Sequence, residues 1–341
     1  MKISDLIRFR NTLQEQLDSL VITKNINNAS LAMQLTVTQS DGIDQDCINK
    51  MVDYKERFDY LSTQSKIIID EIQQYIITLT EQADIAADIQ FGTNYKIEWN
   101  RVFNDGYRRD FYVTDDIHHL VKSRIFQYID WHYPVLQFGC RYNGQEPKKN
   151  KLNFKTLGSQ LNDPDIFLDL TEVLTGGEPL YVCDFNKESM QRNVLKFTPE
   201  YQNKICQYVI KDNDFSTLPA EQFSFILCWN MFNYVTLDIL EKYINSLKVL
   251  LRPGGVILFS YNNCDITDSM LVTEIGVASY MPKRHVTKLC TQLGFEVIAT
   301  YDLPNEIDPI PYTYISWIEI KKPGKLSTVK AHSLIGKIVI K

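Results

Sequence analysis

The sequence predicts an α/β fold: a doubly wound, mostly parallel sheet of seven strands, preceded by an N-terminal α-helical segment. Two observations lead to this prediction. From about residue 133 to residue 322, short apolar runs alternate with amphipathic helical patterns, the order typical of a parallel sheet with helices on both faces. Up to about residue 90, by contrast, the chain has helical periodicity, Gly42 as its only glycine and no proline. The expected strands are Val135–Phe138, Leu180–Cys183, Cys206–Ile210, Phe223–Trp229, Val256–Tyr261, Phe295–Tyr301 and Tyr314–Ile320.

Length and composition limit the class of protein. The chain has 341 residues, enough for two or three domains with a sizeable core. A net charge of -6 argues against nucleic-acid binding by bulk charge. The seven cysteines are scattered and include no C-x-x-C pair, so we expect neither a metal site nor a disulfide scaffold. Because no apolar run could span a bilayer or form a signal peptide, we expect a cytoplasmic protein that does not bind membranes.

Residues 1–90 predict a helical, coiled-coil-like domain. Two sets of residues repeat at intervals of seven and give the a and d positions of a heptad. The first set is Met51, Phe58, Ser65, Ile72 and Leu79, and the second is Tyr54, Leu61, Ile68 and Tyr75. Leu6, Leu13 and Leu20 repeat at the same interval, and the polar segment Asn25–Gly42 is expected to connect two antiparallel helices. The stripe fits packing within one chain and self-association or a protein partner about equally well.

Two further regions flank the sheet pattern. Residues 91–132 form a connecting region with an amphipathic helix that begins at Asp115-Asp116, where acidic side chains favour the positive end of the helix dipole. Residues 133–322 make up the sheet domain, and residues 323–341 form a basic tail with an apolar end. We expect this tail to be an added strand or a docking segment.

Candidate functional residues follow the predicted strands, because ligands of doubly wound sheets bind outside the carboxyl ends of the strands. Gly139 follows the first strand and lets the backbone turn sharply beside a ligand. Asp184 follows the second strand, where its two oxygens can accept hydrogen bonds from both hydroxyls of a ribose. The alternative role of Asp184 is a helix N-cap.

These segments resemble the class I S-adenosylmethionine-dependent methyltransferases. Pro134–Cys140 resembles the glycine-rich first motif of the family, and Phe223–Ser260, with its Arg-Pro-Gly-Gly turn, is the most specific match. The resemblance implies S-adenosylmethionine as cofactor, with Asp184 binding the ribose. The other cofactor-binding residues that it implies are Gln137, Phe138, Gly139, Cys140, Phe185, Asp212, Asn213 and Asn230. Two positions depart from the family: Gln137 stands in place of an acidic residue, and Arg141 in place of a second glycine.

Two functions remain open at this point. The first is methyl transfer to a non-base acceptor, a small molecule or a protein, because the base-methylating Asn-Pro-Pro-Tyr and Asp-Pro-Pro-Tyr motifs and a Pro-Cys nucleophile are absent from the sequence. Such a reaction needs no local catalytic motif, since positioning the acceptor supplies most of the catalysis. The alternative is an inactive structural or assembly protein, such as a component of a viral (phage) particle, that oligomerises through its N-terminal helices. A modifier of nucleic acid that uses the basic run Lys148–Lys151 ranks last.

Overall fold

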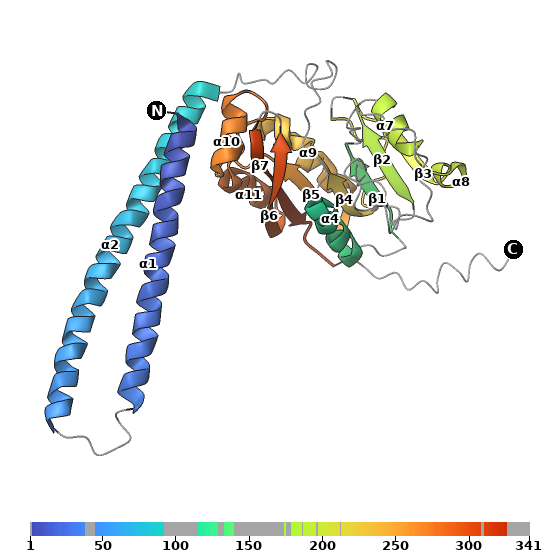
Figure 1. The fold of residues 1–341 in the computed structure, drawn as a ribbon. Helices are drawn as coiled ribbons and strands as arrows, with labels where there is room; N and C mark the ends of the chain where they lie inside the picture. Colours follow the sequence, from blue (N-terminus) through green and yellow to red (C-terminus); the bar gives the residue numbers. More distant parts are fainter. Residues whose placement is uncertain are drawn as a thin grey trace, which may run out of the picture. The chain divides into compact units, whose positions relative to one another are not determined.

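The computed structural model describes residues 2–37, 45–91, 115–128, 133–139, 174, 179–185, 187–195, 197–211, 213–307 and 310–325. The chain divides into two compact units, Met1–Gly92 and Thr93–Lys341 (Figure 1). Cys140, Arg141, the Lys148–Lys151 run, Asp212 and the tail beyond residue 325 lie outside the described residues. Among the described helices, none has the length and apolar character needed to cross a membrane.

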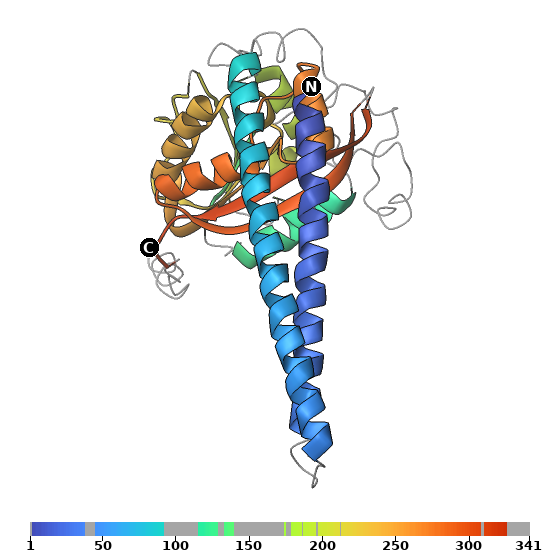
Figure 2. The same cartoon turned by 90° about the vertical axis from the view of Figure 1, so that its left-hand side faces the viewer.

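The first unit is a hairpin of two long helices, α1 (Ile3–Val37) and α2 (Gln45–Phe91). Figures 1 and 2 show the two helices side by side near the N-terminus of α1. Helix α1 continues through Asn25 to Val37, so the expectation that Asn25–Gly42 is a connection is wrong for most of that segment. Asn, Ser and Thr lower helix propensity only modestly, whereas the first residue that strongly opposes a helix is Gly42.

Helix α2 packs on α1 through one heptad register. Most of its buried and half-buried positions between residues 58 and 83 alternate in steps of four and three residues, as expected where two helices pack along a seam. The positions with this spacing are Phe58, Ser62, Ser65, Ile69, Ile72, Ile76, Leu79 and Ala83, and Thr78 and Thr80 are half-buried outside the series. Of the first predicted set, Phe58, Ser65, Ile72 and Leu79 therefore lie in the seam. Of the second set, Leu61, Ile68 and Tyr75 are 61%, 48% and 50% exposed, so they do not pack in the seam with α1, and the alternative of self-association stays a prediction.

The reason for this difference is visible in the sequence. Ile67, Ile68 and Ile69 are consecutive, so a heptad pattern alone could place any of them in the seam. Helix α1 packs on the set of α2 positions that includes Ile69 and Ala83, both of which are buried. The small side chain of Ala83 leaves room for the neighbouring helix. On α1, Leu6 and Leu17 are buried, and Leu13 and Leu20 are half-buried.

The second unit contains the predicted seven-stranded sheet, in the order β3-β2-β1-β4-β5-β7-β6. Strands β1 to β5 run parallel, whereas β7 is antiparallel to both of its neighbours. The strand order reverses beside β1, which creates the switch point where doubly wound sheets bind ligands. The strands are β1 (Val135–Phe138), β2 (Leu180–Asp184), β3 (Ile205–Val209), β4 (Phe223–Cys228), β5 (Leu251–Tyr261), β6 (Glu296–Ile307) and β7 (Ile310–Lys321).

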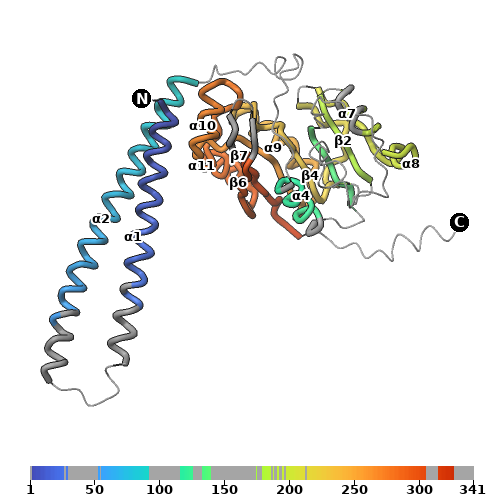
Figure 3. The backbone as a smooth tube through the Cα atoms, viewed as in Figure 1, coloured from blue at the N-terminus to red at the C-terminus, as the bar shows by residue number. Residues whose placement is uncertain are grey.

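Helices cover both faces of the sheet, and Figure 3 follows the backbone through these layers. Helices α9 (Leu237–Leu250) and α11 (Lys283–Gln292) contribute to the core on one face. Helices α4 (Asp115–Tyr128), α7 (Lys187–Val194) and α10 (Thr267–Glu274) contribute to the core on the other. Two short elements, α8 (Pro199–Gln202) and η3 (Phe232–Tyr234), lie in the connections. Every side chain of β1 and β4 is buried, as expected for central strands of a parallel sheet.

A buried ion pair fixes helix α4 against strand β7. Arg124 binds the Glu319 carboxylate at two points, with Nε 2.6 Å from Oε2 and Nη2 2.8 Å from Oε1. The Tyr301 hydroxyl donates a third hydrogen bond to Glu319 at 3.2 Å. Burial, with the Glu319 charge beside it, raises the pKa of the Tyr301 hydroxyl, so this group remains a donor. The helix that begins at Asp115 is therefore part of the sheet domain.

Candidate functional site

The carboxyl ends of β1, β2 and β4 lie side by side. Phe138, the last residue of β1, pairs with Cys183 of β2 and with Cys228 of β4. The residues that follow these three strands are consequently neighbours, although they are far apart in the sequence. This edge brings together Gly139, Asp184 and Asn230, as the sequence predicted.

Gly139 has a backbone conformation and surroundings that require glycine. Its φ angle is +93°, a region that other residues rarely adopt. A Cβ atom at this position would overlap the Met231 side chain and lie 3.1 Å from the Trp229 carbonyl oxygen. The Gly139 amide donates to the Cys183 carbonyl at 2.9 Å. The loop after β4 therefore lies directly on the glycine that follows β1.

Gln137 presents a buried acceptor at the same edge. Its Nε2 atom donates to the Gly139 carbonyl at 3.2 Å. Since a carbonyl can only accept, this bond orients the amide and leaves Oε1 as the remaining acceptor. Oε1 is buried and has no hydrogen-bond partner. The side-chain nitrogen of Gln137 thus holds the loop after β1 in place. Its side-chain oxygen remains available as a hydrogen-bond acceptor, as a carboxylate oxygen would be at this position.

Asp184 is the last residue of β2, and Phe185 follows it. Asp184 is 2% exposed, and its carbonyl accepts a hydrogen bond from the Ile210 amide at 2.9 Å. Phe185 is half-buried and makes edge-to-face contacts with Phe138 and Tyr243, at ring-centroid distances of 5.6 and 6.1 Å. Phe138 itself is buried in this aromatic cluster. The structure places Phe138 in the core as a support for Phe185, rather than at the open edge.

The loops after β3 and β4 add three asparagines. Asn213 and Asn230 have φ angles of 65° and 51°, which asparagine tolerates better than most residues. The Asn230 backbone N–H donates to Ser260 Oγ at 2.7 Å, and the Asn230 side-chain Oδ1 accepts from Asn233 Nδ2 at 2.7 Å. These bonds leave Asn230 Nδ2 and Asn233 Oδ1 buried without partners. The Asn213 Oδ1 atom is unpartnered as well.

A second group of polar residues follows β5, and the sequence analysis missed it. Asn262 Nδ2 donates to Thr273 Oγ1 at 2.8 Å and to the Ser279 carbonyl at 3.1 Å, while its Oδ1 has no partner. Tyr261, the last residue of β5, has a buried hydroxyl without a partner. Burial raises the pKa of this hydroxyl well above its ordinary value, so it stays protonated. The sequence signal that could have revealed this group is the pair Asn262-Asn263, which directly follows an apolar strand.

Unpartnered polar atoms therefore concentrate at one edge of the sheet. Among the described residues, eight buried side-chain atoms have no hydrogen-bond partner, and six of these lie at the carboxyl edge. A buried polar atom without a partner costs roughly 1–3 kcal/mol, so such atoms are rare unless a ligand or water pairs with them. The six are Gln137 Oε1, Asn213 Oδ1, Asn230 Nδ2, Asn233 Oδ1, Tyr261 OH and Asn262 Oδ1.

The buried thiols of this domain are poor nucleophiles. Burial raises the pKa of Cys183 well above its ordinary value, with smaller contributions from Cys228 and the Asp184 charge. Burial likewise raises the pKa of Cys264 and of Cys290 to about 12. Thiols with such pKa values are protonated at neutral pH, so they do not supply a thiolate. In the described parts of the chain, no group of three or more His, Cys, Asp or Glu side chains could hold a metal ion.

Comparison with known families agrees with this geometry. Residues 135–300 match a family model described as a methyltransferase domain. This part of the chain is a methyltransferase domain by that match. The family that the sequence predicted is thereby confirmed, together with the seven-stranded fold. No curated protein matches the chain.

Several solved structures are similar to the methyltransferase domain. The YcgJ protein of Bacillus subtilis has 10% identity and a TM-score of 0.45, with 61% of this chain and 100% of that chain covered. A SAM-dependent methyltransferase of Methanosarcina mazei has 12% identity and a TM-score of 0.42, with 59% and 98% covered. The N-methyltransferase NodS of Bradyrhizobium japonicum WM9, in complex with S-adenosyl-L-homocysteine, has 15% identity and a TM-score of 0.41, with 66% and 91% covered.

Proposed function

We propose that the methyltransferase domain binds S-adenosylmethionine at the carboxyl edge of its sheet and transfers a methyl group to a non-base acceptor. The observation that carries this proposal is the set of unpartnered polar atoms at that edge, on Gln137, Asn213 and Asn230 among others. Their hydrogen-bonding capacity is buried at the switch point of the sheet, where a ligand would satisfy it.

The side chains at the edge fit the chemical groups of this cofactor. Gln137 Oε1 and Asn213 Oδ1 are acceptors, suited to the ammonium group of the amino-acid part and the amino group of adenine. Asp184 is the last residue of β2, where its carboxylate can accept hydrogen bonds from both ribose hydroxyls. The half-buried ring of Phe185 offers an apolar surface for adenine. Gln137, the most conspicuous departure from the family motif, thus keeps an acceptor at its position.

The residues after β4 and β5 are suited to hold the acceptor. S-adenosylmethionine supplies a methyl group that its sulfonium already activates, so the protein mainly has to position the acceptor atom. Asn230 Nδ2 offers a donor, and Asn233 Oδ1 offers an acceptor. Both side chains are fixed by their mutual hydrogen bond, and two hydrogen bonds from Ser279 to the Asn233 carbonyl hold the loop. This pair favours an acceptor with a hydroxyl or amine, from a small molecule or a protein.

Cofactor affinity tests the proposal. Isothermal titration of the full-length protein with S-adenosylmethionine and S-adenosylhomocysteine should give micromolar binding of both. Asp184→Asn keeps the size of the side chain but removes the charge and one acceptor, so we expect affinity to fall by about tenfold or more, equivalent to about 1.4 kcal/mol.

Asp214→Asn is the matched control. Asp214 is exposed and, like Asn213, lies in the loop after β3. Its carboxylate accepts a hydrogen bond from the Ser216 backbone amide at 2.9 Å, within its own turn. We expect its affinity for the cofactor to equal that of the wild type. If a folded wild-type protein binds neither compound, the proposal is wrong, and a structural role for an inactive domain becomes the better explanation.

A further inference from the structure

Helix α2 has a second apolar face besides the seam with α1. Ile69 is 8% exposed in the seam, whereas the preceding Ile68 is 48% exposed. Further exposed apolar side chains lie on the same side of α2 as Ile68, and we name this set the open stripe. The open stripe consists of Tyr60, Leu61, Ile67, Ile68, Tyr75, Ile85 and Ile89. Leu61, Ile68, Tyr75 and Ile89 are separated by multiples of seven residues, the repeat of a helix that packs along another helix.

The centre of the open stripe carries little charge. Between residues 60 and 78, the positions on this side of α2 are otherwise occupied by Gln64, Gln74 and Thr78, with Glu71 as the charged exception. Lys66 belongs to the same stretch but falls on the opposite side of the helix, given 3.6 residues per turn, whereas Asp70, three residues after Ile67, flanks the stripe. A solvated helix face usually has the reverse composition, with charged residues outside and apolar residues inside.

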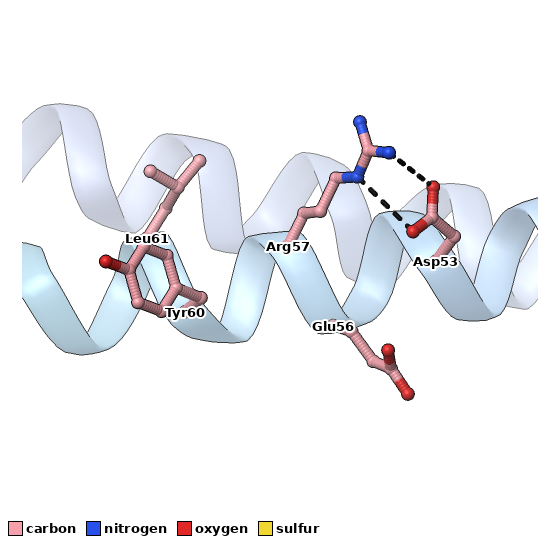
Figure 4. A pocket seen from close by; sticks show the side chains of 5 residues that line it. All are labelled: Asp53, Glu56, Arg57, Tyr60 and Leu61. Atoms are coloured by element: carbon pink, nitrogen blue, oxygen red, sulfur yellow. Dashed lines mark hydrogen bonds and ion pairs between the residues drawn. The ribbon is translucent and has the colours of Figure 1, made fainter.

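The open stripe is continuous with the α1–α2 seam. Phe9 of α1 contacts Tyr75 of the open stripe edge to face, with ring centroids 6.3 Å apart, and both side chains are about half exposed. The contact brings α1 to the border of the stripe, so a helix lying on the stripe would touch both helices of the hairpin. At the other end, Figure 4 shows Tyr60 and Leu61 in a surface hollow that Asp53, Glu56 and Arg57 complete.

We propose that the open stripe packs against the open stripe of a second copy of this chain, so that two hairpins form a four-helix bundle. A second copy supplies the same heptad repeat, and the pairing would extend the packing of the α1–α2 seam to two more helices. In a symmetric dimer the same patch lies on both sides of the interface. The stripe runs from Tyr60 to Ile89, so antiparallel stripes that overlap fully would bring the two Tyr75 side chains, near its midpoint, together.

The face of the hairpin that carries the stripe has the dimensions of a standard interface. The stripe spans residues 60–89, about 45 Å of helix at 1.5 Å per residue, and two helices side by side are about 20 Å wide. Such a face measures about 900 Å², of which the stripe on α2 takes about half, against roughly 800 Å² per partner in a standard interface.

The charge of the hairpin predicts how the dimer responds to salt. Residues 1–92 contain 14 Asp and Glu against 8 Lys and Arg, so two hairpins repel each other outside the stripe. Salt screens this repulsion but leaves the apolar contacts in place. We therefore expect the dimer to become tighter as the salt concentration rises.

Two isoleucines provide a matched test of the interface in the full-length chain. Ile68 and Ile77 are both 48% exposed, and nine residues, or about two and a half helical turns, place them on opposite sides of α2. Sedimentation equilibrium should show a wild-type dimer of twice 39.7 kDa. Ile68→Glu should weaken dimerisation by at least about a hundredfold because it buries a charge within the stripe. Ile77→Glu should dimerise like the wild type.

Cross-linking gives a second test that does not depend on the stability of a charged variant. Tyr75→Cys should form a disulfide between two chains under mild oxidation, since the symmetric pairing brings residue 75 beside its counterpart. Ile77→Cys should not. A wild-type protein that remains monomeric at all accessible concentrations would overturn the proposal, and so would equal effects of the two glutamate variants. Cofactor titration is independent of these results.

Discussion

The sheet domain and the helical hairpin bury their apolar side chains differently. In the sheet domain, every residue of β1 and β4 is buried, and two separate cores lie on opposite faces of the same strands. In the hairpin, the buried residues of α2 from Ile69 to Phe91 lie on one side, and the opposite side and the flank are exposed. A side chain in the sheet is therefore enclosed by layers, whereas a side chain in the hairpin has one neighbouring helix.

This difference determines where polar groups cost most. Within the sheet domain a polar side chain must find a partner, as Arg124 and Glu319 do, or remain unsatisfied, as Gln137 Oε1 does. On the hairpin most polar side chains reach water, so a lost contact changes little. Substitutions in the two units should consequently differ in their effect on stability, and the following predictions test that contrast.

The largest effect is expected for Arg124→Met in the sheet domain. The Glu319 side chain is fully buried and Arg124 is 18% exposed, so the substitution leaves a buried carboxylate without its cation. Breaking a buried pair in this way typically costs about 3–5 kcal/mol of the free energy of unfolding. Denaturant unfolding followed by tryptophan fluorescence measures the cost in this unit alone, because all four tryptophans lie beyond residue 92.

A double substitution separates the charge from the packing. Arg124→Met with Glu319→Gln removes the buried charge as well, so the double variant should be more stable than Arg124→Met alone. The Tyr301 hydroxyl can still donate to the glutamine oxygen. If the single variant loses less than about 1 kcal/mol, the pair contributes little, and the contrast between the two units fails at its strongest point.

An intermediate effect is expected in the seam of the hairpin. Ile69→Ala removes a side chain that is 8% exposed and should cost about 2 kcal/mol, the low end for buried isoleucine, because the seam has one neighbouring helix. Ile77→Ala, at a position 48% exposed, should change stability by less than about 0.5 kcal/mol. Hydrogen exchange of the α1 and α2 amides measures both as local opening free energies. Equal losses would show that the seam is not where the structure places it.

The sheet was predictable from the sequence because its strands combine two strong signals. Val135–Phe138 and Phe223–Cys228 are short apolar runs between turns, and central parallel strands are buried on both faces. The ends of the last two strands were less accurate: β6 reaches Ile307 and β7 begins at Ile310, beyond the expected Tyr301 and Tyr314. Asp302, Pro304 and Pro311 interrupt the apolar pattern in these extensions, so the sequence alone marked only the apolar part of each strand.

The candidate site could be predicted in part. Gly139, Asp184 and Asn230 lie at or just beyond the ends of their strands, and position in the sequence was enough to bring them to one edge. The pairing of Asn230 with Asn233, the bond from Gln137 to Gly139 and the group around Asn262 depend on side-chain orientation, which no local pattern encodes. The heptad pattern of α2 did not fix the seam with α1 for a related reason, since Ile68 and Ile69 differ only in which side of the helix they occupy.

The smallest effect is expected for an ion pair on the surface of α2. Arg57 Nη2 lies 3.0 Å from Asp53 Oδ2, one turn earlier, and both side chains are more than half exposed (Figure 4). Water and salt screen such a pair, so Arg57→Ala should cost less than about 0.5 kcal/mol, an effect that high salt removes. Hydrogen exchange near residue 57 at low and high salt measures it. A loss as large as that of Ile69→Ala would mean that this end of α2 is enclosed by another chain, because only desolvation makes a surface ion pair so strong.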